Sequence, residues 1–160
     1  VEQAVISGIA HNKDEAKLSL IGVPDKPGIA FKILKAISSA NIEVDMIVQS
    51  VSAREGLTNF AFTVHRNDFD KALSILEVVC EDLDAIGVQS DDKVVKVSLV
   101  GIGMRSHAGI ASQMFEVLHH EGINIQMIST SEIKISVVID EKYLELAVRS
   151  LHSAFELDKE

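Results

Sequence analysis

The sequence predicts an α+β fold made of two related β-α-β-β-α-β units, because the chain contains an internal repeat whose second copy lacks its last strand. The segment KLSLIGV at residues 17–23 recurs as KVSLVGI at residues 96–102, which is 79 positions later. The segment GIA at residues 28–30 recurs at residues 109–111, 81 positions later, so the loop GMRSHAG carries a two-residue insertion. A register maintained through strands and a helix indicates duplication.

The first copy, residues 15–90, shows the periodicities of a complete unit. Alternating apolar residues are typical of strands, and apolar residues at helical spacing are typical of amphipathic helices. Asn67 or Asp68 is expected to cap the second helix. An antiparallel sheet with both helices on one face is the ferredoxin-like split βαβ arrangement. The expected strands are residues 16–23, 42–52, 57–66 and 85–90, and the expected helices are residues 28–40 and 67–83.

The second copy is incomplete at its C-terminal end. Its expected strands are residues 94–103, 123–131 and 132–140, and its expected helices are residues 109–120 and 141–155. A missing fourth strand would leave an open sheet edge. The N-terminal segment AVISGIA, residues 4–10, has strand composition and no other partner. We therefore expect the first unit to be inserted into the second, which then comprises residues 1–12 and 93–160.

Composition excludes several classes of function. The net charge of −9 and the lack of a basic cluster argue against a nucleic-acid partner. No apolar run approaches the roughly 18 residues of a membrane-spanning helix, so no membrane partner is expected. The single cysteine, Cys80, forms no internal disulfide and favours a cytoplasmic protein. Because the chain begins at Val1, a fragment or a processed subunit is expected.

Catalytic chemistry is not indicated by the remaining motifs. The six histidines lack metal-ligand spacing, so no metal site is expected. Cys80 lies on the apolar side of its predicted helix and is interpreted as a structural thiol. The glycines of GIG at residues 101–103 are followed by Ser106, where a dinucleotide-binding loop has its third glycine. We therefore expect no catalytic residues in this chain.

Both prolines, Pro24 and Pro27, lie in the loop VPDKPGIA between the first strand and the first helix. Prolines keep the preceding residues extended, so the helix starts after Gly28. The first amides of a helix attract anions such as an amino-acid carboxylate, and Asp25 could take an ammonium group. The alternative is a simple helix-starting turn with a capping aspartate. The second copy, RSHAG, retains the glycine and loses the other features. The amides expected to be unpaired donors are those of Ile29 and Ala30.

The D-K-P-G loop within repeated β-α-β-β-α-β units resembles ACT domains, which often bind amino acids. The segments KVSLVGIGMRSHAGIA, INIQMISTSEIKISVVI, GVPDKPGIA and DMIVQSVS resemble the C-terminal regulatory region of bacterial aspartate kinases, or their separately translated β subunit. The resemblance covers essentially the whole chain, and STSEIKIS is its most specific part.

The resemblance implies feedback control of the kinase by lysine, threonine or both. It implies a homodimer in which ACT units of two chains pair side by side, with the effector between the first unit of one chain and the second unit of the other. ATP and Mg²⁺ are then expected only in a kinase domain outside this chain, which itself takes no cofactor. The effector site implied for the first unit is Asp25, Gly28, Ile29, Ala30 and Gln49, and for the second unit Asn124, Ile125, Thr130 and Ser131.

Two questions remain open at the level of the sequence. Relatives sensitive to both effectors carry polar groups beside the helix starts where this chain has Ile29, Ala61 and Ala111, so the preferred effector is not determined. The same pattern also fits an assembly module that dimerises the kinase with little effector response. A more distant alternative is an ACT pair that controls another enzyme of amino-acid metabolism.

Overall fold

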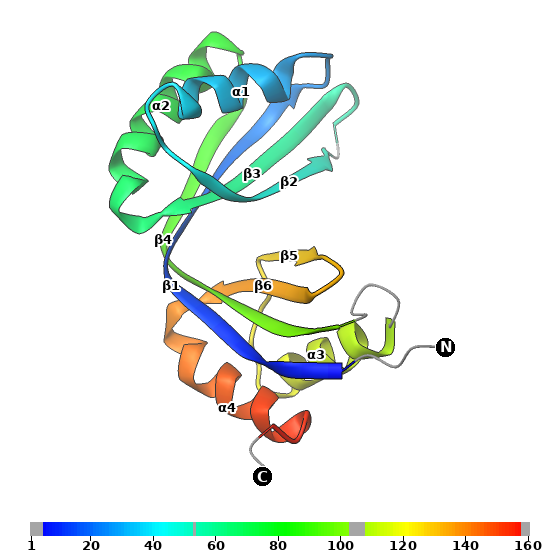
Figure 1. Cartoon of the computed structure of the whole chain (residues 1–160). Coiled ribbons are helices and arrows are strands. Elements are labelled where there is room, and N and C mark those ends of the chain that lie inside the picture. Colours follow the sequence, from blue (N-terminus) through cyan, green and yellow to red (C-terminus); the bar gives the residue numbers. More distant parts are fainter. Residues whose placement is uncertain (1–4, 53, 103–107, 158–160) are drawn as a thin grey trace. The chain divides into compact units, whose positions relative to one another are not determined.

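The computed structural model describes residues 5–52, 54–102 and 108–157. The chain forms two compact units, one of residues 14–93 and one of residues 1–13 together with 94–160. We call these the first and the second unit. Two long strands, β1 (Val5–Pro24) and β4 (Gly87–Ile102), each contribute a segment to both units (Figure 1). The insertion of the first unit into the second is thus confirmed.

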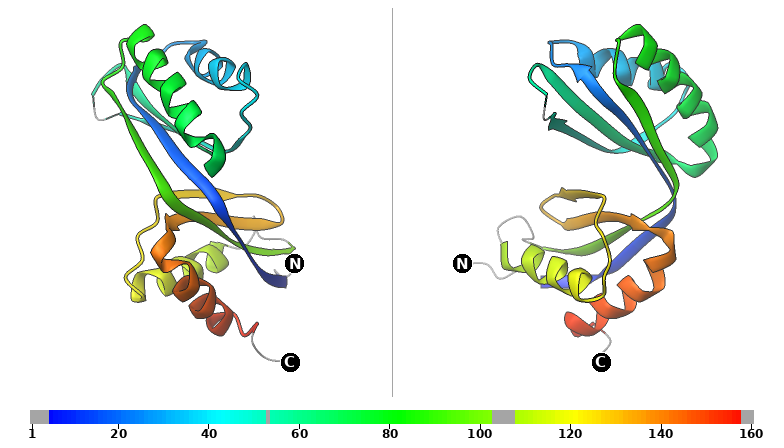
Figure 2. Two further views of the ribbon diagram at one scale, coloured as in Figure 1. Left: turned by 90° about the vertical axis from the view of Figure 1, so that its left-hand side faces the viewer. Right: turned by 180° about the vertical axis from the view of Figure 1, so that it is seen from behind.

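The sheet of the first unit has the strand order β2-β3-β1-β4, the order of a ferredoxin-like unit. Strand β3 (Leu57–His65) is antiparallel to both β1 and β2 (Val44–Val51). Helices α1 (Ile29–Ser38) and α2 (Phe69–Asp82) cover one face of this sheet (Figure 2). The core between them is formed mainly by Leu18, Leu20, Ile33, Ile37, Phe60, Phe62, Val64 and Leu76.

The second unit repeats this plan with its strands in the order β1-β4-β6-β5. Strand β6 (Lys134–Asp140) is antiparallel to both β4 and β5 (Met127–Thr130). Helices α3 (Ala108–His120) and α4 (Leu144–Ala154) cover one face. The core is formed mainly by Val95, Val97, Leu99, Met114, Leu118, Ile135, Val137, Ile139 and Leu151. The N-terminal part of β1 supplies the strand that the second copy lacks.

Several of the predicted strands differ in extent from those observed. The strands predicted at residues 85–90 and 94–103 are one continuous strand, β4. Strand β5 begins at Met127, not at Ile123 as predicted. The Ile123 amide donates to Leu118 O at 2.9 Å and so belongs to the C-terminal end of helix α3. Residues 103–107, which hold most of the loop GMRSHAG and Ser106, lie outside the described residues.

The predicted cap of α2 is wrong. A 3₁₀ turn, η1 (Arg66–Asp68), precedes α2, and His65 caps it: its Nδ1 accepts from the Asn67 amide at 3.0 Å. Neither Asn67 nor Asp68 supplies a capping side chain, since Asp68 at the N-cap of α2 makes no side-chain hydrogen bond there. Asp140 has the same role in the second unit: its Oδ1 accepts a hydrogen bond from the Lys142 amide at 3.0 Å and caps η3 (Glu141–Tyr143).

A bulge in β1 directs the chain toward the loop that follows. The pairing of β1 with β3 shifts between Leu20 and Val23, and Gly22 within the bulge has φ +66°. Its amide donates to Asn59 Oδ1 at 2.9 Å. Glycine suits this left-handed conformation because it has no Cβ. The bulge therefore sets the direction in which β1 continues into Pro24 and the following loop.

Candidate functional site

The loop between β1 and α1 is held to the neighbouring β2–β3 turn. The Asp25 amide donates to Gly56 O at 2.9 Å, and the Lys26 amide donates to Pro24 O at 3.1 Å. The side chain of Asp25 is exposed. The backbone of this loop is thus fixed while its carboxylate faces solvent.

Helix α1 begins without a side-chain cap. Gly28 occupies the N-cap with φ +91°, and no side chain among the described residues makes a capping hydrogen bond to it. The capping aspartate considered above is therefore not observed. The expectation that the Ile29 amide is an unpaired donor is also wrong, because this amide donates to Lys26 O at 3.3 Å. The Ile29 side chain is 8% exposed and belongs to the core, and Ala30 packs half-buried beside it.

Gln49 lies on the helix-covered face of the sheet, at its edge. It is opposite Phe60 of β3, and Phe60 is part of the core beneath the helices. Residues directly opposite each other share a face. The Gln49 Nε2 donates to Thr58 Oγ1 at 3.4 Å, and Thr58 is opposite Val23 near the end of β1. The structure therefore brings Gln49 to the sheet end from which the Asp25 loop leaves.

Ala61 does not lie beside a helix start. It is opposite Val48 of β2 and Ser19 of β1, while its neighbours Phe60 and Phe62 belong to the core. Because successive strand residues point to opposite faces, Ala61 is on the face away from the helices. The polarity of this position therefore cannot act directly at the start of α1. Ala111 packs half-buried against the core of the second unit.

The predicted residues of the second unit have different local roles. Asn124 is exposed in the segment between α3 and β5, and Ile125 packs half-buried on the core. Thr130 is exposed and opposite the core residue Ile135, so it is on the helix-covered face. Ser131 builds the β5–β6 turn instead: its Oγ accepts from the Lys134 amide at 3.2 Å. Its hydroxyl is thus already engaged within the turn.

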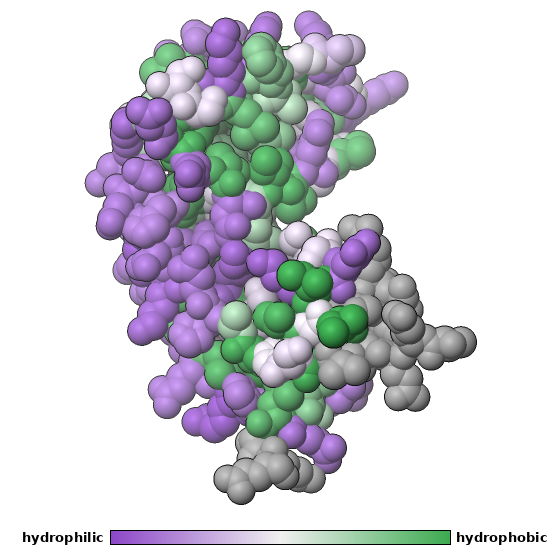
Figure 3. All heavy atoms as spheres, viewed as in Figure 1, coloured by the Kyte–Doolittle hydropathy of each residue, from purple (hydrophilic) through white to green (hydrophobic). Residues whose placement is uncertain are grey.

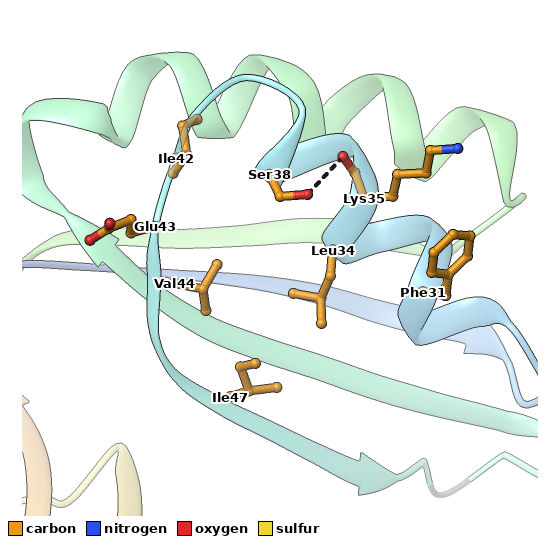
Figure 4. A pocket seen from close by; sticks show the side chains of 8 residues that line it. All are labelled: Phe31, Leu34, Lys35, Ser38, Ile42, Glu43, Val44 and Ile47. Carbon is orange, nitrogen blue, oxygen red and sulfur yellow. Dashed lines mark hydrogen bonds between the residues drawn. The ribbon is translucent and has the colours of Figure 1, made fainter.

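A groove between α1 and β2 was not predicted from the sequence (Figure 4). It is mainly apolar, and two of its large apolar side chains are exposed: Phe31 by 65% and Ile47 by 50%. Figure 3 shows apolar side chains interrupting the hydrophilic surface of this unit. The sequence feature that could have indicated the groove is Phe31, a large apolar residue on the solvent side of the predicted helix. The groove is lined by Phe31, Leu34, Lys35, Ser38, Ile42, Glu43, Val44 and Ile47.

The groove and the predicted residues of the second unit occupy equivalent positions of the repeat. At the offset of 81 residues, Asn124 and Ile125 correspond to Glu43 and Val44 of the groove. Ile128, which is 45% exposed, corresponds to Ile47, and Thr130 corresponds to Gln49. Each unit therefore has an exposed isoleucine at the same place on its edge strand, whereas Phe31 of the groove corresponds to Ser112 on α3.

Other kinds of site find little support in the described part of the chain. It contains no group of three or more histidine, cysteine, aspartate or glutamate side chains placed to hold a metal ion. Cys80 is half-buried against the first core, and its thiol donates to Ala85 O at 3.7 Å. None of the helices within the described ranges has both the length and the apolar character needed to cross a membrane.

The two units match ACT domain models at residues 18–81 and 97–155. The chain is 66% identical over 158 residues to the aspartate kinase of Pseudomonas fluorescens (strain SBW25), covering 99% of this chain and 38% of that protein. A crystal structure of aspartokinase alpha and beta subunits matches with a TM-score of 0.88 and 55% identity, covering 95% of this chain and 99% of the matched chain. The regulatory subunit of aspartate kinase from Thermus thermophilus (ligand-free form) matches with a TM-score of 0.87 and 39% identity, covering 94% of this chain and 98% of that one. The chain therefore belongs to the aspartokinase family, in which it corresponds to the regulatory region of two ACT domains.

Proposed function

We propose that this chain senses an amino acid and thereby controls aspartate kinase, which converts ATP and L-aspartate to 4-phospho-L-aspartate. The effector is lysine, threonine or both. The observation that carries the proposal is the start of α1, where an exposed Asp25 lies before a helix that is not capped by any side chain in the described part of the chain. Gln49 reaches the same end of the sheet through Thr58.

The chemistry of this loop suits a zwitterion. The Asp25 carboxylate attracts an ammonium group, and the positive end of the helix dipole attracts a carboxylate. The Ile29 amide is used within the loop, so the donor that we propose for the carboxylate is the next amide, that of Ala30. Gln49 and Asn124 offer both a donor and an acceptor to the effector backbone.

We further propose that the effector binds across two chains, with the first unit of one chain beside the second unit of the other. The support is that each unit has an edge strand, β2 or β5, with an exposed isoleucine at the equivalent position, Ile47 or Ile128. Ligand bound there favours the paired state, and it shifts kinase activity only if its affinity differs between the active and inhibited states.

The remaining partners follow from the same proposal. The catalytic domain of aspartate kinase lies outside this chain and handles ATP and Mg²⁺, so the regulatory units take no cofactor. We expect the complex to work in the cytoplasm, with which a single unpaired cysteine is consistent.

One observation favours the alternative of a pure assembly module. The groove beside α1 is mainly apolar, and a surface used only for dimerisation needs no converging polar groups. In that case Asp25, Gln49 and Asn124 contribute nothing to ligand binding. The two functions therefore differ in whether an amino acid binds.

Isothermal titration of the chain with L-threonine, with L-lysine and with both tests the proposal. We expect saturable binding of at least one amino acid, and weaker binding by Asp25→Asn and Asn124→Ala. Glu55→Gln is the matched control, because Glu55 is an exposed carboxylate in the nearby β2–β3 turn.

Inhibition is measured next in the complete kinase carrying the same substitutions. Equal inhibition of wild type and both variants would refute the proposed site. An absence of binding heat at millimolar amino acid, with inhibition also absent in the complete kinase, would favour the assembly module.

A further inference from the structure

The hydroxyl group of Thr58 links strands β3 and β2 at the end of the sheet where the candidate site lies. Thr58 is 3% exposed, and its Oγ1 donates to Ser50 O of β2 at 2.8 Å. A hydroxyl group has one proton, and a carbonyl oxygen can only accept, so this hydrogen bond uses the only side-chain donor of Thr58. Thr58 can therefore offer only lone pairs to another polar group beside it.

The side-chain amide of Gln49 uses these lone pairs. Its Nε2 donates to Thr58 Oγ1 at 3.4 Å. The reversed amide would place Oε1 against an oxygen whose proton is already taken by Ser50, so two acceptors would face each other. The hydrogen bond between Thr58 and Ser50 thus selects one of the two orientations of the Gln49 amide. In that orientation Oε1 accepts no hydrogen bond within the described part of the chain and is left for a ligand.

The segment that holds Gln49 also holds the Asp25 loop. Thr58 is opposite Val23 of β1. Gly56, two residues before Thr58, accepts a hydrogen bond from the Asp25 amide at 2.9 Å. The first residues of β3 and the turn before them therefore fix both the backbone of Asp25 and the side chain of Gln49. The groups that these two residues leave for a ligand are a carboxylate and an amide oxygen, which both accept hydrogen bonds.

From these hydrogen bonds we infer that Thr58 is a positioning residue that orients Gln49 so that its Oε1 accepts from the ammonium group of the effector. The inference rests on the proposed amino-acid sensing and deepens it. Thr58 is buried and acts through Gln49. Recognition of the ammonium group is thereby assigned to the first unit, with Asp25 as the charged acceptor and Gln49 as the neutral one.

The second unit does not repeat this arrangement. Thr130 takes the place of Gln49 at the offset of 81 residues. Ile133 precedes the cross-strand partner of Thr130 by two residues, as Thr58 precedes the partner of Gln49. The side chain of Ile133 is 57% exposed and has no polar atom, so it cannot orient a neighbouring polar side chain. The comparison therefore supports a specific role for Thr58 in the first unit.

Isothermal titration of the whole chain with L-threonine and with L-lysine tests the role of Thr58. Thr58→Val removes the hydroxyl group and keeps the shape of the side chain. We expect it to weaken binding roughly threefold to tenfold, which is the effect of one neutral hydrogen bond. Thr58→Ser retains the hydroxyl group and is expected to bind like wild type. In the Gln49→Ala background, Thr58→Val is expected to cause no further loss, because Thr58 acts only through Gln49.

Gln49→Glu distinguishes an accepting role of Gln49 from a donating one. A glutamate side chain at neutral pH accepts hydrogen bonds and donates none. We therefore expect Gln49→Glu to bind the amino acid at least as tightly as wild type, because a carboxylate attracts an ammonium group. Gln49→Leu, which has neither donor nor acceptor, is expected to bind roughly threefold to tenfold more weakly.

Thr63→Val is the matched control for Thr58→Val. Thr63 is a buried threonine of the same strand, and its Oγ1 also bonds to β2, accepting from the Met46 amide at 3.0 Å. Thr63 lies between the core residues Phe62 and Val64 in the strand, so its side chain is on the face away from the helices. Thr63→Val is expected to lose stability in urea unfolding but to bind the amino acid like wild type. Circular dichroism verifies that every variant is folded.

Four outcomes would overturn the inference while wild type still binds an amino acid. These are unchanged binding by Thr58→Val, equal weakening by Thr58→Val and Thr63→Val, a further loss when Thr58→Val is added to Gln49→Ala, and equal weakening by Gln49→Glu and Gln49→Leu. In each of these cases the proposed amino-acid sensing stands. If wild type binds neither amino acid, the proposed sensing fails, and the inference fails with it.

Discussion

Replacing Gly22 with alanine is expected to destabilise the first unit by about 2–4 kcal/mol. Gly22 has φ +66°, where an alanine costs about 1 kcal/mol even after its effect on the unfolded chain is included. A Cβ at this position would also clash with Ile86 Cδ1 and lie 3.0 Å from Ile86 Cβ. The Ile86 backbone cannot move freely, because its amide donates to Ile21 O at 2.9 Å. Overpacking of this kind typically costs about 1–3 kcal/mol.

Two further variants separate the backbone contribution from the steric one. Gly56 has φ +78°, and a Cβ added to it would meet no atom within 4 Å, so Gly56→Ala measures the backbone contribution alone, about 1 kcal/mol. Ile86 is 56% exposed, and Ile86→Ala in the Gly22→Ala background is expected to recover most of the steric part. Urea unfolding followed by circular dichroism measures each free energy of unfolding. The reasoning is refuted if Gly22→Ala costs no more than Gly56→Ala, or if Ile86→Ala restores nothing.

Three other substitutions probe the second unit. Ser98→Ala is expected to lower the free energy of unfolding by about 1–3 kcal/mol, because it leaves the buried Ser136 hydroxyl without the hydrogen bond of 2.7 Å that it shares with Ser98. The double variant Ser98→Ala/Ser136→Ala is expected to be nearly as stable as wild type. Urea unfolding measures both, and equal losses of stability would contradict the prediction. Asp140→Ala is expected to lower the free energy of unfolding by about 1 kcal/mol through loss of the η3 cap, and Asp140→Asn by much less. Thermal unfolding measures both, and equal melting temperatures of Asp140→Ala and wild type would show that the cap contributes nothing. Leu118→Ala is expected to lower the free energy of unfolding by about 2–5 kcal/mol, because Leu118 is fully buried. The control Val78→Ala, at an exposed position, is expected to change it by under about 0.5 kcal/mol. Urea unfolding measures both, and similar effects of the two would argue against this core.

The periodic elements were the part of the fold most open to prediction. Leu18, Phe62 and Val137 lie in alternating runs, and their burial follows directly from the alternation of faces along a strand. The insertion of one unit into the other followed from counting strands, since an incomplete sheet needs a partner for its edge. The limits of individual elements were less predictable: Ile123 reads as strand, yet its amide closes α3.

The local structural roles of the proposed site residues could not be predicted from the sequence. The Ile29 amide is taken up by Lys26 O, and Ser131 is engaged in its own turn. Ala61 lies on the face away from the helices, a consequence of its register with Val48. His65 caps η1 through Nδ1, although histidine is an unusual choice beside Asn67 and Asp68. These roles depend on hydrogen bonds and register, which residue type alone does not specify.

The sequence by itself determined the duplicated α+β plan, the order of its elements and the resemblance to aspartate kinase regulation, because repeats and periodic burial are local properties of the chain. Only the tertiary structure decided that Gln49 reaches the end of the sheet near Asp25, that α1 lacks a side-chain cap, and that an apolar groove follows α1 and β2. The physical reason is that these features join segments distant in sequence. Their geometry is set by strand register and helix packing, which emerge only when the whole unit has folded.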